Sequence, residues 1–150
     1  HKMLDLLIDN SRIPFTDIAK KLLISAGTVH VRVKKMEEFG IIKGASLALD
    51  YKKLGYTFIA YIGIFLEKTH LTNYVLEKLD SIPYATVAHI TTGRFNIFCK
   101  VRCKDTDHAK EIIFMIDDIE GVSRTETMIS LEESINDKKR LMHKIFNEIK

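Results

Sequence analysis

The stretch LLISAGTVHVRVKKMEEFGIIKG, residues 22–44, decides the fold of the N-terminal part of this chain. A Ser-Ala-Gly turn in this stretch is followed by a segment with valines on one side and lysines on the other. Ser25 is a residue type that favours the start of a helix, and Gly40 is one that favours its end. The pattern therefore predicts a helix whose start and stop are both encoded locally.

Two further helices are predicted before this one. Apolar residues between Met3 and Ile8 indicate the first helix, and the chain starts with His1 inside that pattern, so we expect its first residues to be missing. The second follows Pro14, with Thr16-Asp17 as its cap. Three helices in about 40 residues, with a tight turn between the second and the third, predict a helix-turn-helix.

The third helix has two different faces. At about 100° per residue, Val29, Val33 and Met36 form a stripe that we expect to be buried. The opposite face carries Gly27, Val31, Lys34 and Glu38, flanked by Thr28, His30 and Lys35. Small side chains allow close approach to base edges, and lysines one turn later reach phosphates. A recognition helix for DNA fits this pattern, and so does a solvated surface helix with incidental lysines.

Positive charge is concentrated in the same region. The chain of 150 residues carries a net charge of +3. Residues 12–35 hold six lysines and arginines against one aspartate, a local charge of +5, so the remainder sums to −2. Charge distributed in this way indicates a polyanionic partner near the N-terminus.

The second half of the chain changes its period. We expect an α+β fold in which the N-terminal winged helix-turn-helix is followed by a ferredoxin-like βαββαβ domain. Its elements are strand 57–67, helix 71–82, strands 84–93 and 94–103, helix 105–119 and strand 121–133. The segment IIKGASLAL, 41–49, is expected to form a strand or short hairpin within an N-terminal domain 1–50. A linker at 51–56 and a basic amphipathic helix at 134–150 complete the predicted organisation.

The first strand of this domain is apolar on both sides. The residues from Phe58 to Leu66 alternate between two faces, and nearly all are hydrophobic. One face can lie under the two helices. The other needs a partner, most simply the sheet of a second copy, so the strand predicts a dimer.

Several other classes of protein are disfavoured. Cys99 and Cys103 are separated by about 13 Å on a strand, too far for a disulfide, so we expect two small buried side chains in a reducing compartment. The sequence has no long apolar run, no signal peptide, no Cys/His cluster with metal spacing and no nucleotide-binding or catalytic motif. We therefore expect a cytoplasmic protein that is not an enzyme, with no membrane segment, metal or other cofactor.

The whole pattern resembles the Lrp/AsnC family of bacterial and archaeal transcription regulators. The segment NSRIPFTDIAKKLLISAGTVHVRVKKMEEFGIIKG is similar to the helix-turn-helix of that family. LGYTFIAYIGI, TTGRFNIFCKV and GVSRTETMISL are similar to the strands of its amino-acid-sensing domain. The resemblance covers nearly the whole chain and is nearest to the AsnC branch.

The resemblance implies a homodimer that binds double-stranded DNA and assembles into an octamer of four dimers. The DNA-reading residues that it implies are Ser25, Gly27, Thr28, His30, Val31 and Arg32, with Lys34 and Lys35 on phosphates. Arg32 has an alternative role, since it could pair with Glu38 or hold the helix. Arg12 could reach a phosphate or brace the turn between helices.

The resemblance also implies an amino-acid effector bound between dimers, asparagine or another amino acid. The site maps to the turn Thr91-Thr92-Gly93-Arg94, with Asp117 and Asp118 available for the α-ammonium group from a neighbouring dimer. Backbone N–H groups, hydroxyls and an arginine suit a carboxylate. An ordinary hairpin turn is the simpler interpretation. His89 and Ile90 replace an expected aromatic residue, so the effector can differ from asparagine.

Two other functions are compatible with the same two-domain fold. Sirohaem decarboxylases use histidine and arginine on a tetrapyrrole, and His89 and Arg94 could act in that way. A stand-alone amino-acid sensor that has lost DNA binding is the other alternative. The charge of +5 over residues 12–35 argues against both.

Overall fold

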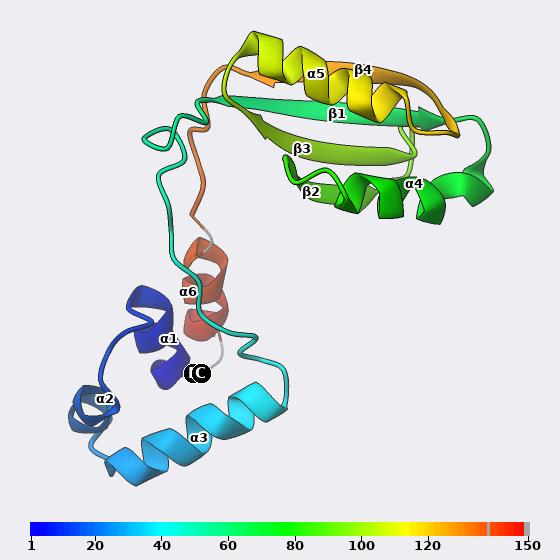
Figure 1. The fold of residues 1–150 in the computed structure, drawn as a ribbon. Coiled ribbons are helices and arrows are strands. Elements are labelled where there is room, and N and C mark those ends of the chain that lie inside the picture. Colours follow the sequence, from blue (N-terminus) through cyan, green and yellow to red (C-terminus); the bar gives the residue numbers. More distant parts are fainter. Residues whose placement is uncertain (138, 149–150) are drawn as a thin grey trace. The chain divides into compact units, whose positions relative to one another are not determined.

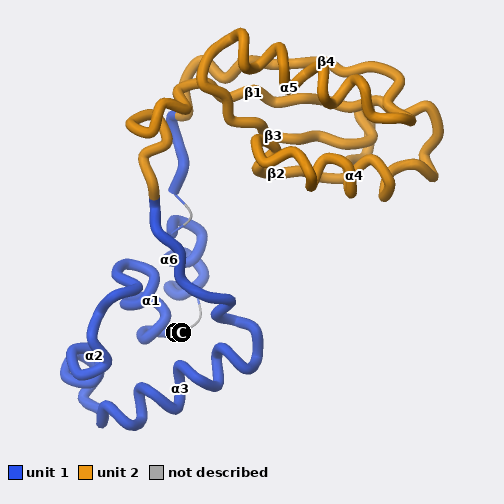
Figure 2. Tube along the Cα trace, in the orientation of Figure 1, with its two compact units in different colours: residues 1–48, 134–150 blue, residues 49–133 orange. Residues whose placement is uncertain are grey.

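The computed structural model describes residues 1–137 and 139–148, which form two compact units (Figures 1 and 2). The first unit combines His1–Ala48 with the C-terminal segment from Ser134 onward, and the second is Leu49–Glu133. The chain therefore passes between the units twice. Among the residues that the structure describes, no helix combines the length and apolarity that crossing a bilayer requires.

The first unit contains the three predicted helices, α1 (Lys2–Asp9), α2 (Phe15–Leu22) and α3 (Ala26–Glu38). Their buried side chains form one small core, comprising Met3, Ile18, Ala19, Val29 and Val33. The expected cap of α2 at Thr16-Asp17 is wrong. Pro14 occupies the N-cap position with φ −59°, and its carbonyl accepts hydrogen bonds from the backbone N–H groups of Asp17 and Ile18. The fixed φ of proline is compatible with a helix start two residues before Thr16.

The turn between α2 and α3 lies at Leu23 and Ile24, not at the expected Ser-Ala-Gly. Leu23 adopts a left-handed conformation with φ 56°, uncommon for a residue with a side chain, and its side chain is exposed. Ser25 is the N-cap of α3, because its Oγ accepts a hydrogen bond from the backbone N–H of Thr28 at 3.1 Å. Ala26 and Gly27 therefore form the first turn of the helix.

The segment after α3 differs from the prediction. Gly40 has φ 69°, and the N–H groups of Ile41 and Ile42 donate to the carbonyl of Met36 at 2.9 and 3.1 Å, which closes the helix. The strand or hairpin expected at 41–49 is wrong, since these residues form no regular structure. A strand needs a neighbour for its backbone hydrogen bonds, and this exposed segment has none in the described chain.

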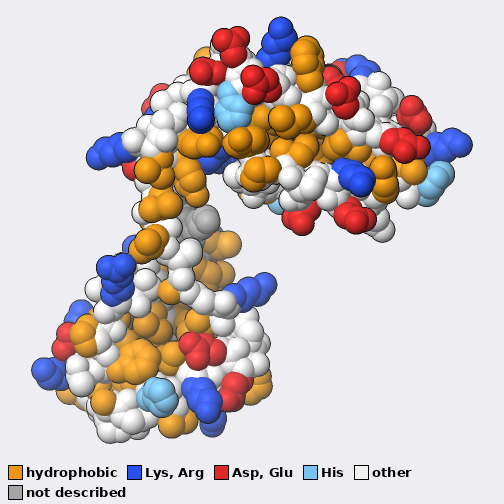
Figure 3. Space-filling model, in the orientation of Figure 1, with side chains coloured by type: hydrophobic (Ala, Val, Ile, Leu, Met, Phe, Trp, Pro, Cys, Tyr) orange, Lys and Arg blue, Asp and Glu red, His pale blue; other side chains and the backbone are white. Residues whose placement is uncertain are grey.

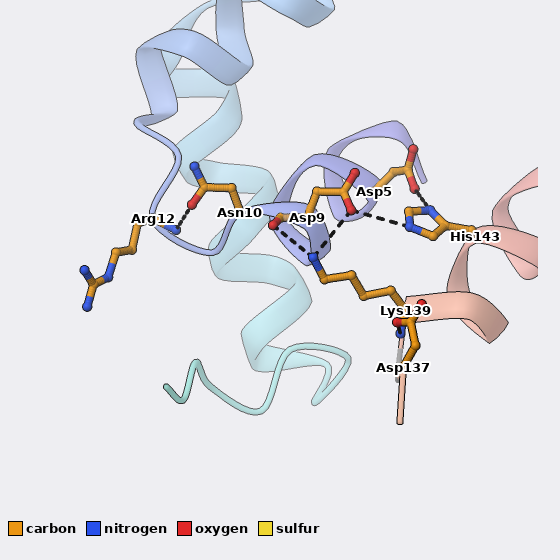
Figure 4. Close-up of polar contacts among 7 residues, drawn as sticks. All are labelled: Asp5, Asp9, Asn10, Arg12, Asp137, Lys139 and His143. Atoms are coloured by element: carbon orange, nitrogen blue, oxygen red, sulfur yellow. Dashed lines mark hydrogen bonds and ion pairs between the residues drawn. The ribbon is translucent and has the colours of Figure 1, made fainter. Parts of the chain in front are cut away.

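The C-terminal helix α6 (Lys139–Glu148) packs with α1 in the first unit. His143 lies between two carboxylates of α1, with Nδ1 at 2.7 Å from Asp5 Oδ1 and Nε2 at 3.4 Å from Asp9 Oδ1 (Figure 4). Lys139 Nζ donates to the backbone carbonyl of Asp9 at 3.1 Å. The helix begins later than the predicted position 134, and positions 138, 149 and 150 lie outside the described residues. The first unit is thus built from both ends of the chain.

The second unit confirms the ferredoxin-like βαββαβ order. A four-stranded antiparallel sheet has the strand order β2-β3-β1-β4. A short 3-10 turn, Thr69–Leu71, precedes the first helix. The elements are β1 (Phe58–Leu66), α4 (Thr72–Asp80), β2 (Ala85–Ile90), β3 (Ile97–Cys103), α5 (Thr106–Asp117) and β4 (Val122–Ser130) (Figure 1).

The core of this unit lies between one face of the sheet and the two helices. Ala60, Ile62 and Ile64 of β1 are fully buried against α4 and α5. Cys99 and Cys103 belong to the same core, and both are free thiols, as the sequence predicts. Burial raises the pKa of the Cys99 thiol to about 11, and burial likewise raises the pKa of Cys103.

Neither cysteine of the folded protein is expected to react with iodoacetamide at about pH 8, because the thiolate is the nucleophile and burial suppresses it. The raised pKa of Cys99 delays its ionisation until the pH approaches 11. Intact-mass measurement before and after unfolding in urea checks this expectation. Rapid labelling of the folded chain would contradict the assigned core position of the two thiols.

The opposite side of the sheet, which we call the open sheet face, is lined by aromatic side chains. Tyr61 stacks on Phe98 with ring centroids 5.8 Å apart, and Phe95 contacts both Phe98 and Phe65 at 5.9 and 5.2 Å. Gly63 lies beneath the ring of Phe95, where a Cβ atom would collide with ring carbons. β1 is therefore apolar on both sides, as predicted.

Candidate DNA interface and effector site

The face of α3 that points away from the core carries Gly27, Val31 and Lys34. Val29 and Val33 point into the core, and the periodicity of the helix directs the other three residues outward. The side chain of Val31 is 52% exposed, a high value for an apolar residue on a helix. This face thus begins with small or apolar residues and becomes basic about one turn later.

The flanks of α3 are fixed by contacts with neighbouring residues. The Thr28 and Ser25 hydroxyl oxygens are 2.8 Å apart at the start of the helix. The ring of His30 lies 6.0 Å from that of Phe15, at the start of α2. Ser25, Thr28 and His30 therefore have restricted positions beside the outer face.

Arg32 and Lys35 follow Thr28 by four and seven residues, so they lie on the same flank of α3 as Thr28, towards α1. Both line a cavity of about 490 Å³ together with Lys2 and Phe39. The alternative pairing of Arg32 with Glu38 is absent from the described structure. Arg32 therefore keeps its charge available to an external group.

The cations between positions 12 and 35 share one property. None of these cations forms an ion pair within residues 1–137 and 139–148. They are Arg12, Lys20, Lys21, Arg32, Lys34 and Lys35. Basic side chains project from the face of the first unit drawn in Figure 3. Lys20 and Lys21, exposed in the last turn of α2, were counted in the charge but were not named among the candidate DNA-binding residues. The charge count was the signal that could have identified them.

Arg12 follows α1 in the turn that leads to α2. Its backbone N–H donates to Asn10 Oδ1 at 3.0 Å, and its side chain points away from the cluster around His143 (Figure 4). The turn is therefore held by the backbone of Arg12, and its guanidinium group is left exposed.

The turn between β2 and β3 contains the residues expected to bind the effector. Thr91 donates its hydroxyl to the carbonyl of Phe95 at 2.7 Å, so this group already has an internal partner. Thr92 and Gly93 are exposed, and Gly93 has φ 94°, which favours glycine. Asn96, which the sequence did not single out, fixes the turn by accepting a hydrogen bond from the N–H of Leu66 at 2.9 Å.

Arg94 of the same turn is engaged by a carboxylate of its own chain. Its Nη2 atom lies 2.6 Å from Glu126 Oε1 on β4, and Arg124 Nη1 approaches the same oxygen at 3.1 Å. Arg124 also lies over the ring of Phe65, 3.9 Å from its centroid. A ligand carboxylate that binds Arg94 must therefore compete with Glu126 or share the guanidinium group with it.

The two acidic residues lie at the end of α5. Asp117 accepts a hydrogen bond from the hydroxyl of Thr125 at 2.8 Å, and Asp118 is exposed at the C-cap. Thr125 and Glu126 are neighbours on β4, and successive side chains of a strand point to opposite faces. A single chain therefore does not bring Asp117 and Arg94 together on one face of the sheet.

The fold and these surfaces define a class of protein. A helix-turn-helix unit with exposed cations is joined twice to a ferredoxin-like sheet unit, which is the organisation of a two-domain DNA-binding regulator. Residues 1–43 match the model of a winged helix-turn-helix DNA-binding domain, and residues 59–139 match that of the Lrp/AsnC ligand binding domain. The chain belongs to the Lrp/AsnC family of transcriptional regulators.

Comparisons with individual proteins support the same family. The chain is 38% identical over 134 residues to the regulatory protein AsnC of Escherichia coli K12, covering 89% of this chain and 88% of that protein. The solved structure of E. coli AsnC is similar, with a TM-score of 0.86 and 37% identity over 89% of this chain and 91% of that one. The feast or famine regulatory protein of M. tuberculosis, solved with L-methionine, shares the fold at a TM-score of 0.83 and 19% identity, covering 91% and 92%.

Proposed function

We propose that this transcriptional regulator binds double-stranded DNA by inserting the outer face of α3 into the major groove. The observation that carries the proposal is the order of the side chains on that face. Exposed small residues come first, and lysines that form no ion pair in the described chain follow them. Helices of this kind present their N-terminal residues to base edges. The alternative of a solvated surface helix predicts no preference for one DNA sequence over another.

The proposed contacts divide into two groups. Base edges face the start of α3, where the residues are Ser25, Gly27, Thr28, His30 and Val31. Phosphates face the cations, which are Arg12, Lys20, Lys21, Arg32, Lys34 and Lys35. Phosphate contacts orient a protein on the duplex, and base contacts supply the sequence preference.

Replacing Thr28 by alanine is expected to reduce discrimination between target and random DNA by about tenfold. The backbone N–H of Thr28, which bonds to Ser25, remains in this variant, so the start of α3 is preserved. Selection from a random DNA library, followed by titration of the enriched and random sequences, measures the effect. In the matched variant Lys34→Ala, affinity should fall about equally for both sequences. Unchanged discrimination in Thr28→Ala would remove Thr28 from the base-reading group.

The open sheet face is proposed to pair with that of a second copy. It presents half-buried aromatic rings, among them Tyr61, Phe65 and Phe98. Association into dimers, and of four dimers into an octamer, would place helix-turn-helix units on half-sites about 34–36 Å apart or a multiple of that distance. Sedimentation of the free protein and footprinting of the complex test the two parts separately.

An amino acid is proposed as the effector, bound at the turn 91–94 through its carboxylate. Gly93 and Thr92 offer exposed donors and Arg94 a guanidinium group. The α-ammonium group is assigned to Asp117 and Asp118 of a neighbouring copy, because Asp117 and Arg94 of one chain lie on opposite faces of β4. A protein of the same fold was solved with L-methionine, and asparagine is the second candidate.

A thermal-shift screen against the twenty amino acids tests the effector. A ligand at 100 times its Kd stabilises the folded state by about 2.7 kcal/mol.

The family consists of regulators, and we propose that this chain is not an enzyme. We also propose that it acts in the cytoplasm, where DNA is its ligand and its thiols stay reduced. A purified protein that binds tetrapyrroles would favour the decarboxylase instead.

A further inference from the structure

Two segments of the chain connect its two units, and we call them the outgoing and the returning passage. Where they meet the sheet unit, both passages contact the same strand, β3. The boundaries lie at Leu49 and Glu133. On the outgoing side, the ring of Tyr51 covers the guanidinium group of Arg102, with 4.5 Å between Cζ and the ring centroid. On the returning side, Glu133 accepts a hydrogen bond from Lys100 Nζ at 2.6 Å and lies 3.8 Å from Arg102 Nη2. Both cations belong to β3.

These two ion pairs are the least exposed of those in the described residues. The side chains of Lys100 and Arg102 are 17% and 16% exposed and that of Glu133 is 25% exposed, whereas Arg94 in the pair with Glu126 is 67% exposed. Water and salt screen partly buried pairs less than exposed pairs. The contacts to β3 are therefore expected to persist under conditions in which the surface pairs exchange.

The register of the sheet explains why one strand holds both passages. Lys100 and Arg102 are two residues apart on β3, so their side chains emerge on the same face. They stand opposite Tyr61 and Ile59 of β1, on the open sheet face. Arg102 contacts residues of both passages, and Lys100 reinforces the returning one.

We infer that Tyr51, Lys100, Arg102 and Glu133 form a clamp, the β3 clamp, that ties both connections to one strand and couples the sheet unit to the DNA-binding unit. β3 begins at Ile97, directly after the turn that contains Arg94. A displacement of β3 at that turn reaches Tyr51 and Glu133 together through the clamp. The coupling of the two units rests on the proposed function, whereas the existence of the clamp does not.

The clamp makes a specific prediction, namely that a change on the returning passage loosens the outgoing one. Residues 52–56 follow Tyr51 in a turn whose N–H groups bond to Asp50 and to backbone carbonyls. In the full chain, Glu133→Gln is expected to accelerate hydrogen exchange of these amides by on the order of threefold to tenfold, because Arg102 loses its anchor. Exchange of the β1 amides serves as the internal reference for global stability.

Matched variants isolate the clamp. Glu132→Gln removes a neighbouring carboxylate that is exposed and forms no ion pair within the described residues, and it should leave exchange at 52–56 unchanged. Tyr51→Phe retains the aromatic ring and should behave like the unmodified chain. Arg102→Lys keeps the charge but loses the planar stack, so exchange at 52–56 should rise. Equal exchange at 52–56 in Glu133→Gln and the unmodified chain would overturn the inference.

The coupling is measured by the ratio of DNA dissociation constants with and without L-asparagine or L-methionine. In Glu133→Gln this ratio should move towards one, while the thermal shift caused by the amino acid is retained. A ratio equal to that of the unmodified chain would show that β3 does not couple the units through the clamp. If the unmodified chain responds to neither, the ratio is measured with the amino acid that the thermal-shift screen identifies. If none of the twenty changes DNA binding, the effector proposal fails, and the exchange experiment still decides whether the clamp exists.

Discussion

Replacing Lys34 and Lys35 together by alanine is expected to weaken binding to every DNA sequence by on the order of 50-fold at about 0.1 M salt. Each lysine that neutralises a phosphate releases about 0.9 counterion, so each contact contributes a factor of about eight at that concentration. The two lysines are exposed on α3 and form no ion pair within the described chain. Their loss therefore removes external contacts and leaves no internal partner uncompensated.

The salt dependence of binding provides the measurement. With six phosphates neutralised, the slope of log K against log salt is expected near −5, and about −3.6 after both substitutions. Lys78→Ala with Lys110→Ala removes the same charge from exposed positions on α4 and α5, where these lysines lie over Tyr74 and Phe114. This pair should leave the slope unchanged. An equal loss in both double variants would mean that net charge, and not the position of α3, governs binding.

Replacing Arg94 by alanine is expected to abolish the response to the amino acid and to leave DNA affinity in its absence unchanged. A charge-assisted pair with a carboxylate is among the stronger polar contacts available to a small ligand. No other arginine lies in the turn 91–96. Titration of DNA binding with the amino acid identified by the thermal-shift screen measures the response.

Arg124→Ala is the matched control for this prediction. Arg124 approaches the same carboxylate as Arg94, at 3.1 Å from Glu126 Oε1, but it lies on β4 over the ring of Phe65. Its removal likewise takes one of two arginines from Glu126, but it keeps the guanidinium group of the turn. A response that survives in Arg94→Ala, or that is lost equally in both variants, would refute the assignment of the carboxylate site.

Much of the fold was predictable because its determinants are local. The stripe formed by Val29 and Val33 follows from helical periodicity, and the N-cap at Ser25 and the stop at Gly40 follow from residue types at fixed positions. The alternation of β1 similarly predicted a strand that is apolar on both faces. The left-handed Leu23 was missed, because nothing in its residue type favours that conformation.

The errors and omissions concern segments whose structure depends on residues that are distant in the sequence. The segment 41–49 has the composition of a strand, but whether it becomes one depends on a neighbour that it lacks in the described chain. The packing of α6 depends on His143 meeting Asp5 and Asp9 from the other end of the sequence. In the effector turn, the engagement of Arg94 by Glu126 follows from the position of β4, which no local pattern reveals.

The most direct test of the central claim is photo-crosslinking from the outer face of α3. A thiol-reactive crosslinker attached to Val31→Cys is selective, because the two native thiols are buried. Val31 is 52% exposed on α3, and Phe114, 55% exposed on α5, provides a control position of equal accessibility. On irradiation with duplex DNA, Val31→Cys should crosslink to bases and Phe114→Cys should not. Crosslinking from position 114 but not from position 31 would contradict the account.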